Sequence, residues 1–306
     1  MIQQSANAVV MIRPFRFFPN PETASDNAFQ REAVATEADT NSRAAQTEFD
    51  QAVEVLRTAR VTVHVFDDTA LPEKPDAVFP NNWFSTHPNG RVALYPMYSP
   101  SRRNERRRDV IDELGKSYRI SALVDYSSYE QRGLHLESTG SLVLDYVNRI
   151  AYVSLSKRSA RGLVERFCQD FDFEPMLFES VGDDGRPIYH TNVLMCVGSE
   201  FALIGLDLIA YPRQRETIRH RLEASGKKVI ELKRDQIANF AGNALELRND
   251  SEKLLVLSSR AMAALTAEQR NEIEGHARLV PLALPTIELA GGSARCMVAT
   301  IHLAPL

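Results

Sequence analysis

The stretch HTNVLMCVG, residues 190–198, joins a short polar cluster to an apolar run, and this pattern recurs along the chain. Counterparts begin at residue 136 (LESTGSLVLD), residue 240 (FAGNALEL) and residue 293 (SARCMVATIHL). These starts lie 54, 50 and 53 residues apart, and FPNNWFS begins at residue 79, 57 residues before the unit at 136. A turn that leads into a buried strand gives such a pattern, and a fixed period indicates a repeated supersecondary unit. The sequence therefore predicts five repeats.

Helical segments separate these strands, which indicates mixed α/β units. SARGLVERFCQDF (159–171) and TAEQRNEIEGHARL (266–279) have helical periodicity. If the units surround an axis, their polar clusters converge on one central site, whereas an open α/β sheet would place the strand ends along a crevice. A further helix precedes the predicted strand VTVHVF (61–66), and its apolar face consists of Phe49, Ala52, Val53 and Leu56.

Composition restricts the class of protein. The 306 residues are 44% hydrophobic and 25% charged with a formal net charge of -4, so no global charge favours nucleic acid or a membrane surface. No apolar run approaches the roughly 18 residues of a membrane span, and residues 9–12 are too short for a signal peptide core. We expect a cytoplasmic protein. Three cysteines without CxxC spacing argue against disulfides and structural zinc.

Cys296, in GGSARCMVA (291–299), is the first candidate for chemistry. A thiolate nucleophile needs a polar or positive environment and access to substrate, and the preceding glycines and Arg295 offer both. Free cysteines are also among the most buried residues, so a core role stays open for Cys296. We interpret Cys168, in an amphipathic helix, and Cys196, in an apolar run, as core residues.

His190 and Glu137 stand at the heads of their repeats, as Cys296 does. Equivalent positions around an axis would face one another, so His190 is a candidate general acid and base for Cys296. Glu137 precedes an apolar run, where a buried carboxylate requires a cationic or hydrogen-bonding partner. The alternatives are a structural histidine and a glutamate that faces water.

Two further segments have ambiguous patterns. SRRNERRRD (101–109) contains five arginines, but acidic residues at helical spacing and the absence of aromatic residues indicate a solvated helix rather than a nucleic-acid site. Residues 20–48 are polar at first and could form either a lid or a surface loop. The phosphate-loop, dinucleotide, zinc-protease and serine-hydrolase motifs are absent, so we predict no cofactor and no metal.

Five segments in order resemble the guanidino-group-modifying enzymes, the superfamily of arginine deiminases, dimethylarginine dimethylaminohydrolases and amidinotransferases. The resemblance covers nearly the whole chain and implies one catalytic domain, 1–306, with the five-bladed α/β propeller called the pentein fold. The segments are PDAVFPNNWF (75–84), LESTGSL (136–142), LSKRS (155–159), YHTN (189–192) and GGSARCM (291–297).

The resemblance also implies roles for individual residues. Cys296 would be the nucleophile, His190 the general acid and base, and Glu137 the carboxylate that orients the substrate and the histidine. The substrate contacts would include Asp76, Asn81 and Asn82, with Arg158 and either Arg102 or Arg103 holding the substrate carboxylate, a task that suits the planar guanidinium.

One departure from the family pattern bears on the substrate. Where deiminases and dimethylarginine hydrolases have an aspartate that binds the guanidinium, this chain has Asn82. Losing one partner of a buried ion pair costs about 3 to 5 kcal/mol, so arginine should bind poorly. A ureido group is neutral and offers both donors and an acceptor, which a carboxamide can match. FPNNW together with FAGNALEL resembles the citrulline-utilisation hydrolases, a deiminase-related branch.

We therefore expect hydrolysis of citrulline to ornithine, carbon dioxide and ammonia through a thiol ester on Cys296, with His190 as imidazolium protonating the departing nitrogen. The rival enzymes are an arginine deiminase or dimethylarginine hydrolase that acts on a guanidino compound, and an amidinotransferase. The rival from another class is a non-catalytic binding protein of the same fold. The sequence also leaves a homodimer open.

Overall fold

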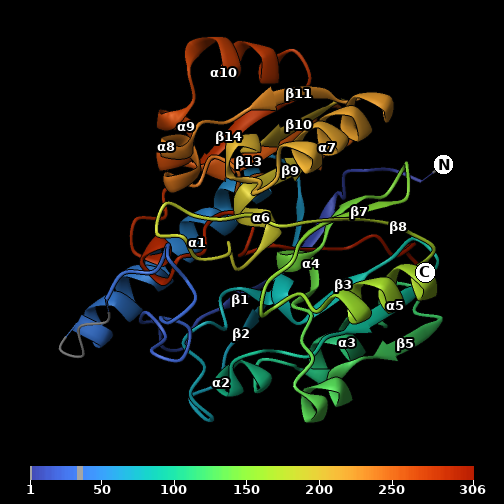
Figure 1. Cartoon of the computed structure of the whole chain (residues 1–306). Coiled ribbons are helices and arrows are strands. Elements are labelled where there is room, and N and C mark those ends of the chain that lie inside the picture. The colour runs from blue at the N-terminus through green and yellow to red at the C-terminus, as the bar shows by residue number, and fades with distance from the viewer. Residues whose placement is uncertain (1, 33–36) are drawn as a thin grey trace.

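The strands of the computed structural model, which describes residues 2–32 and 37–306, form five sheets of three strands (Figure 1). In chain order, the first sheet contains β3 (Phe84–Thr86), β4 (Arg91–Leu94) and β5 (Ala122–Asp125), and the second contains β6 (Val143–Asp145), β7 (Ile150–Ser154) and β8 (Glu174–Phe178). The third contains β9 (Met195–Val197), β10 (Phe201–Ile204) and β11 (Lys228–Glu231). The fourth contains β12 (Leu245–Arg248), β13 (Lys253–Ser258) and β14 (Arg278–Leu282). The fifth contains β15 (Ala299–Thr300), β1 (Ala8–Arg13) and β2 (Thr62–Asp67).

Every sheet has the same internal order. Its first two strands are antiparallel, and its third strand runs parallel to the second. A parallel pair requires a crossover connection, which here is helical in each repeat. The crossover helices lie at the periphery of the molecule (Figure 1): α1 (Ala38–Thr58), α3 (Arg108–Leu114), α5 (Arg161–Phe171), α7 (Pro212–Ala224), and α9 (Ser259–Ala264) with α10 (Ala267–Glu274).

The fifth sheet joins the two ends of the chain. β15 pairs antiparallel with β1, so that Val9 lies opposite Thr300 and Val10 opposite Ala299, and β1 then pairs with β2. This pairing closes the ring of repeats. The structure therefore confirms the five-bladed α/β propeller and excludes the open sheet.

A short helical turn precedes the first strand in three of the repeats, at the position of the polar clusters in the sequence. These turns are η2 (Pro80–Asn82), α4 (Ser138–Ser141) and α6 (Thr191–Leu194), and α4 contacts both η2 and α6. Hydrogen bonds from side chains of these turns connect neighbouring repeats. For example, the hydroxyl of Ser138 donates to the carbonyl of Phe84 at 2.8 Å. The turns therefore gather in the middle of the ring.

Most of the predicted helices and strands are confirmed. The predicted apolar face of α1 is buried throughout. The helix predicted over 266–279 is too long, because α10 ends at Glu274 and β14 already begins at Arg278. Ala277 and Val280 are buried on the strand side of Gly275, so packing in the sheet overrides the helical pattern there. The remaining elements are α2 (Pro100–Arg103), η3 (Ser127–Arg132), η4 (Leu206–Leu208), α8 (Arg234–Ala238) and η5 (Ile287–Ala290).

Candidate active site

The central turns enclose one small cavity. Cys296 and His190 face it from the last and the third of the predicted repeats, counted from the N-terminus, and Glu137 lies behind His190 with no exposed surface. The polar clusters of the repeats therefore meet, as the axial arrangement predicted. The residues that line the cavity are Thr23, Asn27, Asp76, Phe79, Asn82, Arg102, Arg158, Tyr189, His190, Ala290, Gly292 and Cys296.

His190 is hydrogen-bonded to Glu137. The distance from Nε2 of His190 to Oε2 of Glu137 is 2.8 Å, and both side chains are buried. Burial lowers the pKa of His190 to about 4 even though Glu137 opposes this shift, so the imidazole is neutral at pH 7. No described residue forms a hydrogen bond with Nδ1 of His190, which leaves this nitrogen available for proton transfer.

Glu137 is the anionic centre of the site. Burial alone would raise its pKa, but Arg158 at 3.4 Å, His190, and Arg102 at 3.6 Å hold the pKa well below its usual range. The backbone N–H of Tyr98 donates to the other carboxylate oxygen at 2.9 Å. Glu137 is therefore ionised, and its position is fixed from several sides.

Cys296 is held by two carboxamides that the sequence did not single out. Nδ2 of Asn192 lies 3.4 Å and Nδ2 of Asn243 lies 3.3 Å from its Sγ. Asn243 is oriented in turn, because its Oδ1 accepts from the backbone N–H of Arg295 at 3.1 Å. The only sequence signal for these asparagines is their place in the polar clusters of neighbouring repeats.

The other two cysteines lie in the core, as predicted. Cys168 is on α5 and Cys196 is on β9, and both are buried among apolar side chains. Burial raises the pKa of each thiol to about 12. Neither is suited to act as a nucleophile at neutral pH.

The predicted substrate contacts Asp76 and Asn82 line the cavity, and Asn81 is buried next to Asn82 without being one of the lining residues. The hydrogen-bond network orients the Asn82 carboxamide so that its oxygen accepts from Arg102 at 3.0 and 3.2 Å and its nitrogen donates to Oδ1 of Asn81 at 3.2 Å. Nδ2 of Asn81 has no partner among the described residues. Burial raises the pKa of Asp76, although Arg102 and a hydrogen bond from Asn20 oppose this shift.

Gly140 allows Asn82 and His190 to approach each other. A Cβ atom at this position would collide with the Asn82 carboxamide and would lie 2.9 Å from Nδ1 of His190. Only glycine fits there without a displacement of both side chains.

The interpretation of most of the arginine-rich segment as a solvated helix does not extend to Arg102 and Glu105, which are buried. Arg102 is buried at the cavity and forms a bidentate pair with the buried Glu105, at 2.8 and 2.9 Å. Arg103 points away from the cavity, toward Glu130 at 3.5 Å. Of the two arginines predicted as alternatives, only Arg102 lies at the site.

Residues 20–31, here called the covering segment, lie over the cavity. Asp26 forms a bidentate pair with Arg158 at 2.8 and 2.9 Å, and Asn27 donates to the carbonyl of Ala290 at 3.1 Å. The volume of the cavity is about 10 Å³, room for one water molecule. The segment 20–48 is therefore not one unit, since residues 38–48 belong to α1 and residues 33–36 lie outside the described part of the chain.

Within residues 2–32 and 37–306, no group of three or more His, Cys, Asp and Glu side chains is arranged to hold a metal ion. The same part of the chain contains no helix of the length and hydrophobicity that a membrane span needs.

Comparisons with known proteins agree with this architecture. The family described as N,N dimethylarginine dimethylhydrolase, eukaryotic, matches residues 13–303. No curated protein matches the chain.

Solved structures match over nearly the full chain. The N-terminal domain of ArgZ bound to its substrate, described as an arginine dihydrolase from the ornithine-ammonia cycle in cyanobacteria, has a TM-score of 0.75 at 15% identity and covers 96% of this chain and 97% of its own. Unliganded AgrE also has a TM-score of 0.75 at 15% identity, over 96% of this chain and 39% of AgrE. A dimethylarginine dimethylaminohydrolase adduct with S-methyl-L-thiocitrulline has a TM-score of 0.63 at 12% identity, over 98% and 100%. At these identities the structures establish the shared fold.

Proposed function

The chain belongs to the N,N-dimethylarginine dimethylhydrolase family within the guanidino-group-modifying superfamily, and from this premise we propose that it hydrolyses the ureido group of citrulline. The family makes it a hydrolase of C–N bonds other than peptide bonds. The proposed products are ornithine, carbon dioxide and ammonia, and one water molecule is consumed.

The carboxamide pair Asn81 and Asn82 is the observation that carries this proposal. A guanidinium group offers only hydrogen-bond donors and carries a positive charge, whereas a ureido group also offers a carbonyl acceptor. Within the described part of the chain, no group accepts from the buried Nδ2 of Asn81, which adjoins the lining residue Asn82. An unmade buried hydrogen bond costs about 1 to 3 kcal/mol, so a substrate that brings a carbonyl oxygen to this position is favoured.

In the proposed mechanism, Sγ of Cys296 attacks the ureido carbon. Because His190 is neutral at pH 7, we propose that it accepts the thiol proton as the C–S bond forms, rather than starting as an imidazolium. The imidazolium then donates this proton to the departing nitrogen as the C–N bond breaks, which leaves a thiol ester of a carbamic acid. His190 next deprotonates a water molecule that displaces Cys296, and the released carbamic acid breaks down to carbon dioxide and an amine or ammonia.

The remaining residues have binding roles in this proposal. Glu137 orients His190 and accepts a hydrogen bond from a substrate N–H, and Asp76 contacts the substrate. Arg102 and Arg158 bind the α-carboxylate. Entry of citrulline requires the covering segment to move, because the cavity holds about one water molecule. Residues 20–31 therefore serve as a lid.

A second candidate is hydrolysis of a guanidinium substrate, and the charge of the site favours it. The guanidinium groups of Arg102 and Arg158 at the cavity lie within ion-pair distance of four buried or half-buried carboxylates. These carboxylates are Asp26, Asp76, Glu105 and Glu137. An excess of carboxylates would stabilise a cation. ArgZ, which shares the fold, is described as an arginine dihydrolase.

The test is to measure the amino-acid product, ornithine or citrulline, and the amine product, ammonia or dimethylamine, released from L-citrulline, L-arginine and dimethylarginine. We expect activity on citrulline alone, a loss of at least about 10⁴-fold in Cys296→Ala, and little change in the control Cys168→Ala. Asn82→Asp should lower kcat/KM for citrulline by about 10 to 100-fold and raise it for arginine. Turnover of arginine but not citrulline would establish the second candidate, and no turnover of any of the three would refute both.

A further inference from the structure

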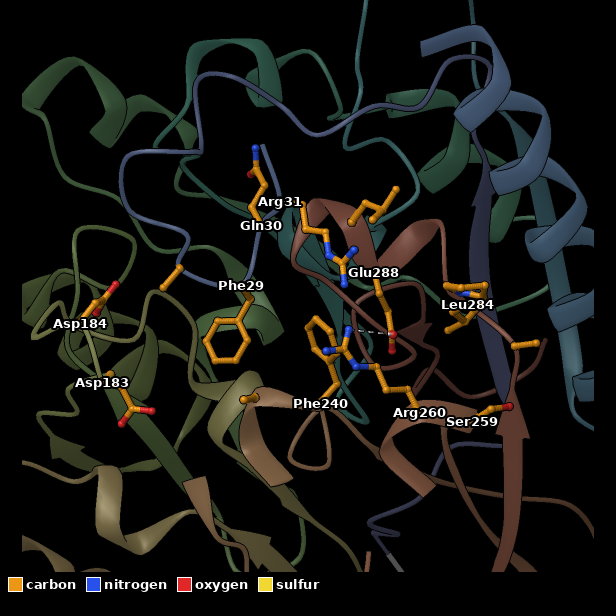
Figure 2. A pocket seen from close by; sticks show the side chains of 16 residues that line it. Phe29, Gln30, Arg31, Asp183, Asp184, Phe240, Ser259, Arg260, Leu284 and Glu288 are labelled. Atoms are coloured by element: carbon orange, nitrogen blue, oxygen red, sulfur yellow. Dashed lines mark ion pairs between the residues drawn. The ribbon is translucent and has the colours of Figure 1, made fainter. Parts of the chain in front are cut away.

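A second and much larger pocket lies on the outer side of the covering segment. Its volume is about 930 Å³, within the range of small-molecule sites, and Figure 2 shows the side chains that line it. The walls come from the end of the covering segment, the turn at 182–184, the ends of α8 and α9, and residues 283–289, which lead into the loop that carries Cys296.

Three charged side chains converge at one side of this pocket. Arg31 and Arg260 point toward Glu288 in Figure 2. Nη1 of Arg260 lies 3.8 Å from Oε2 of Glu288, a distance at which the pair is not hydrogen-bonded. The side chain of Glu288 is only 3% exposed, and no carboxylate of the described residues lies within 4 Å of Arg31. Glu288 therefore has one guanidinium within 4 Å, and Arg31 adds a second positive charge without an ion-pair partner among the described residues, so this side of the pocket has a positive charge in excess.

An apolar surface adjoins the charged side. The ring centroids of Phe29 and Phe240 are 5.8 Å apart, and the guanidinium of Arg260 lies 5.4 Å from the centre of the Phe240 ring. Phe29 is only partly buried. Leu284 and Pro285 continue the apolar lining. The charged side thus places two cations and one buried anion beside aromatic and aliphatic surface. The two other carboxylates of the lining, Asp183 and Asp184, are paired with Arg234 and Arg186.

We propose that this pocket binds a free α-amino acid with an apolar side chain. Arg31 and Arg260 bind the α-carboxylate, since a guanidinium pairs with a carboxylate through two parallel hydrogen bonds. Oε2 of Glu288 accepts from the α-ammonium group. The side chain of the amino acid packs on Phe29 and Phe240. This site is separate from the catalytic cavity and does not depend on which substrate Cys296 hydrolyses.

Successive residues of the same two segments line the pocket and the catalytic cavity, so an occupant of the pocket acts on the site. The covering segment runs from Asn27 at the cavity to Arg31 at the pocket, where the backbone N–H of Arg31 donates to the carbonyl of Leu289 at 2.9 Å. Glu288 accepts from the hydroxyl of Ser293 at 2.7 Å, in the loop that carries Cys296. An amino acid bound to Arg31 and Glu288 together links the covering segment to this loop and opposes opening of the cavity.

Calorimetric titration of the full chain with L-phenylalanine and L-leucine tests the binding. We expect saturable binding at one site, weakened at least tenfold in Arg31→Ala and in Arg260→Ala. The matched control is Arg213→Ala on the exposed face of α7, which should bind as the wild type does. L-Phenylalaninamide, which lacks the carboxylate, should bind at least tenfold more weakly than L-phenylalanine.

Alkylation of Cys296 by iodoacetamide tests the coupling without any substrate. Saturating L-phenylalanine should slow alkylation severalfold in the wild type and leave the rate unchanged in Arg260→Ala, while circular dichroism verifies that both are folded. The proposal is overturned if neither amino acid binds, or if binding is unaffected by both arginine substitutions. Competition between citrulline and L-phenylalanine for one site, with full binding in Arg260→Ala, would also overturn it, because the ligand would then occupy the catalytic cavity.

Discussion

The two sides of the catalytic cavity are built on different electrostatic principles. On the side of His190, the buried groups carry charge, and Glu137 is surrounded by Arg158, Arg102 and the imidazole. On the side of Cys296, the sulfur accepts hydrogen bonds from the neutral amide donors of Asn192 and Asn243, and the neighbouring cation Arg295 is not hydrogen-bonded to it among the described residues. A charged network fixes protonation states before substrate arrives, whereas neutral dipoles stabilise negative charge on sulfur without a permanent counter-ion.

The largest expected effect comes from the charged side. Glu137→Gln removes the anion that orients His190 and the one carboxylate that pairs with both Arg102 and Arg158, so kcat should fall by about 10² to 10⁴-fold. Steady-state kinetics, together with the thermal midpoint, measures this change.

The matched control is Glu105→Gln, which breaks a buried pair with Arg102 but does not touch His190. It should lower the thermal midpoint and raise KM more than it lowers kcat. An equal loss of kcat in both variants would show that the orientation of His190 is not what Glu137 contributes.

A smaller effect is expected on the neutral side. A hydrogen bond to a charged group contributes about 1.5 to 3 kcal/mol, so Asn192→Ala and Asn243→Ala should each slow alkylation of Cys296 at pH 7 by about 10 to 100-fold. Asn243→Ala should have the larger effect, because this side chain also bonds to the backbone of Arg295 and Asn192. The exposed Asn104→Ala serves as control. Unchanged alkylation in both variants would mean that the thiolate does not depend on these donors.

The sequence was sufficient for the architecture of the repeats, because each repeat carries its own local signal. A turn of small and polar residues before an apolar strand recurs at a near-constant interval, and the strands at 143, 195 and 245 follow three of these turns in the structure. Resemblance to a family then supplied Cys296, His190 and Glu137, which do meet at one cavity or directly beside it. These features are either local or fixed by the order of motifs along the chain.

The partners of these residues were not predictable, because they depend on closure of the ring. Arg158 pairs with Asp26 across 132 positions of sequence, and no local pattern marks Asp26 as a buried residue. The burial of Arg102 together with Glu105 was not predictable for a different reason. Their spacing is typical of a solvated helix, yet the two side chains pair bidentately, and this compensation allows both to be buried.

The smallest expected effect is the pH dependence of stability, which tests the side of His190. His190 has a pKa of about 4 when folded and about 6.5 when unfolded, so between pH 5 and 6.5 the unfolded chain binds the extra proton and stability falls as pH falls.

In His190→Asn the slope of the unfolding free energy against pH should be smaller by up to about 1.4 kcal/mol per pH unit, while Asn192→Ala should keep the wild-type slope. Glu137 loses its contribution only below this window. Burial raises the pKa of Glu105 to about 7, but this group is present in the wild type and in both variants, so its contribution cancels in the comparison of slopes. Denaturant unfolding at pH 5.0, 5.5, 6.0 and 6.5 measures the slopes. Equal slopes in His190→Asn and the wild type would mean that the folded imidazole is already protonated, and the proton for the departing nitrogen would then not have to come from Cys296.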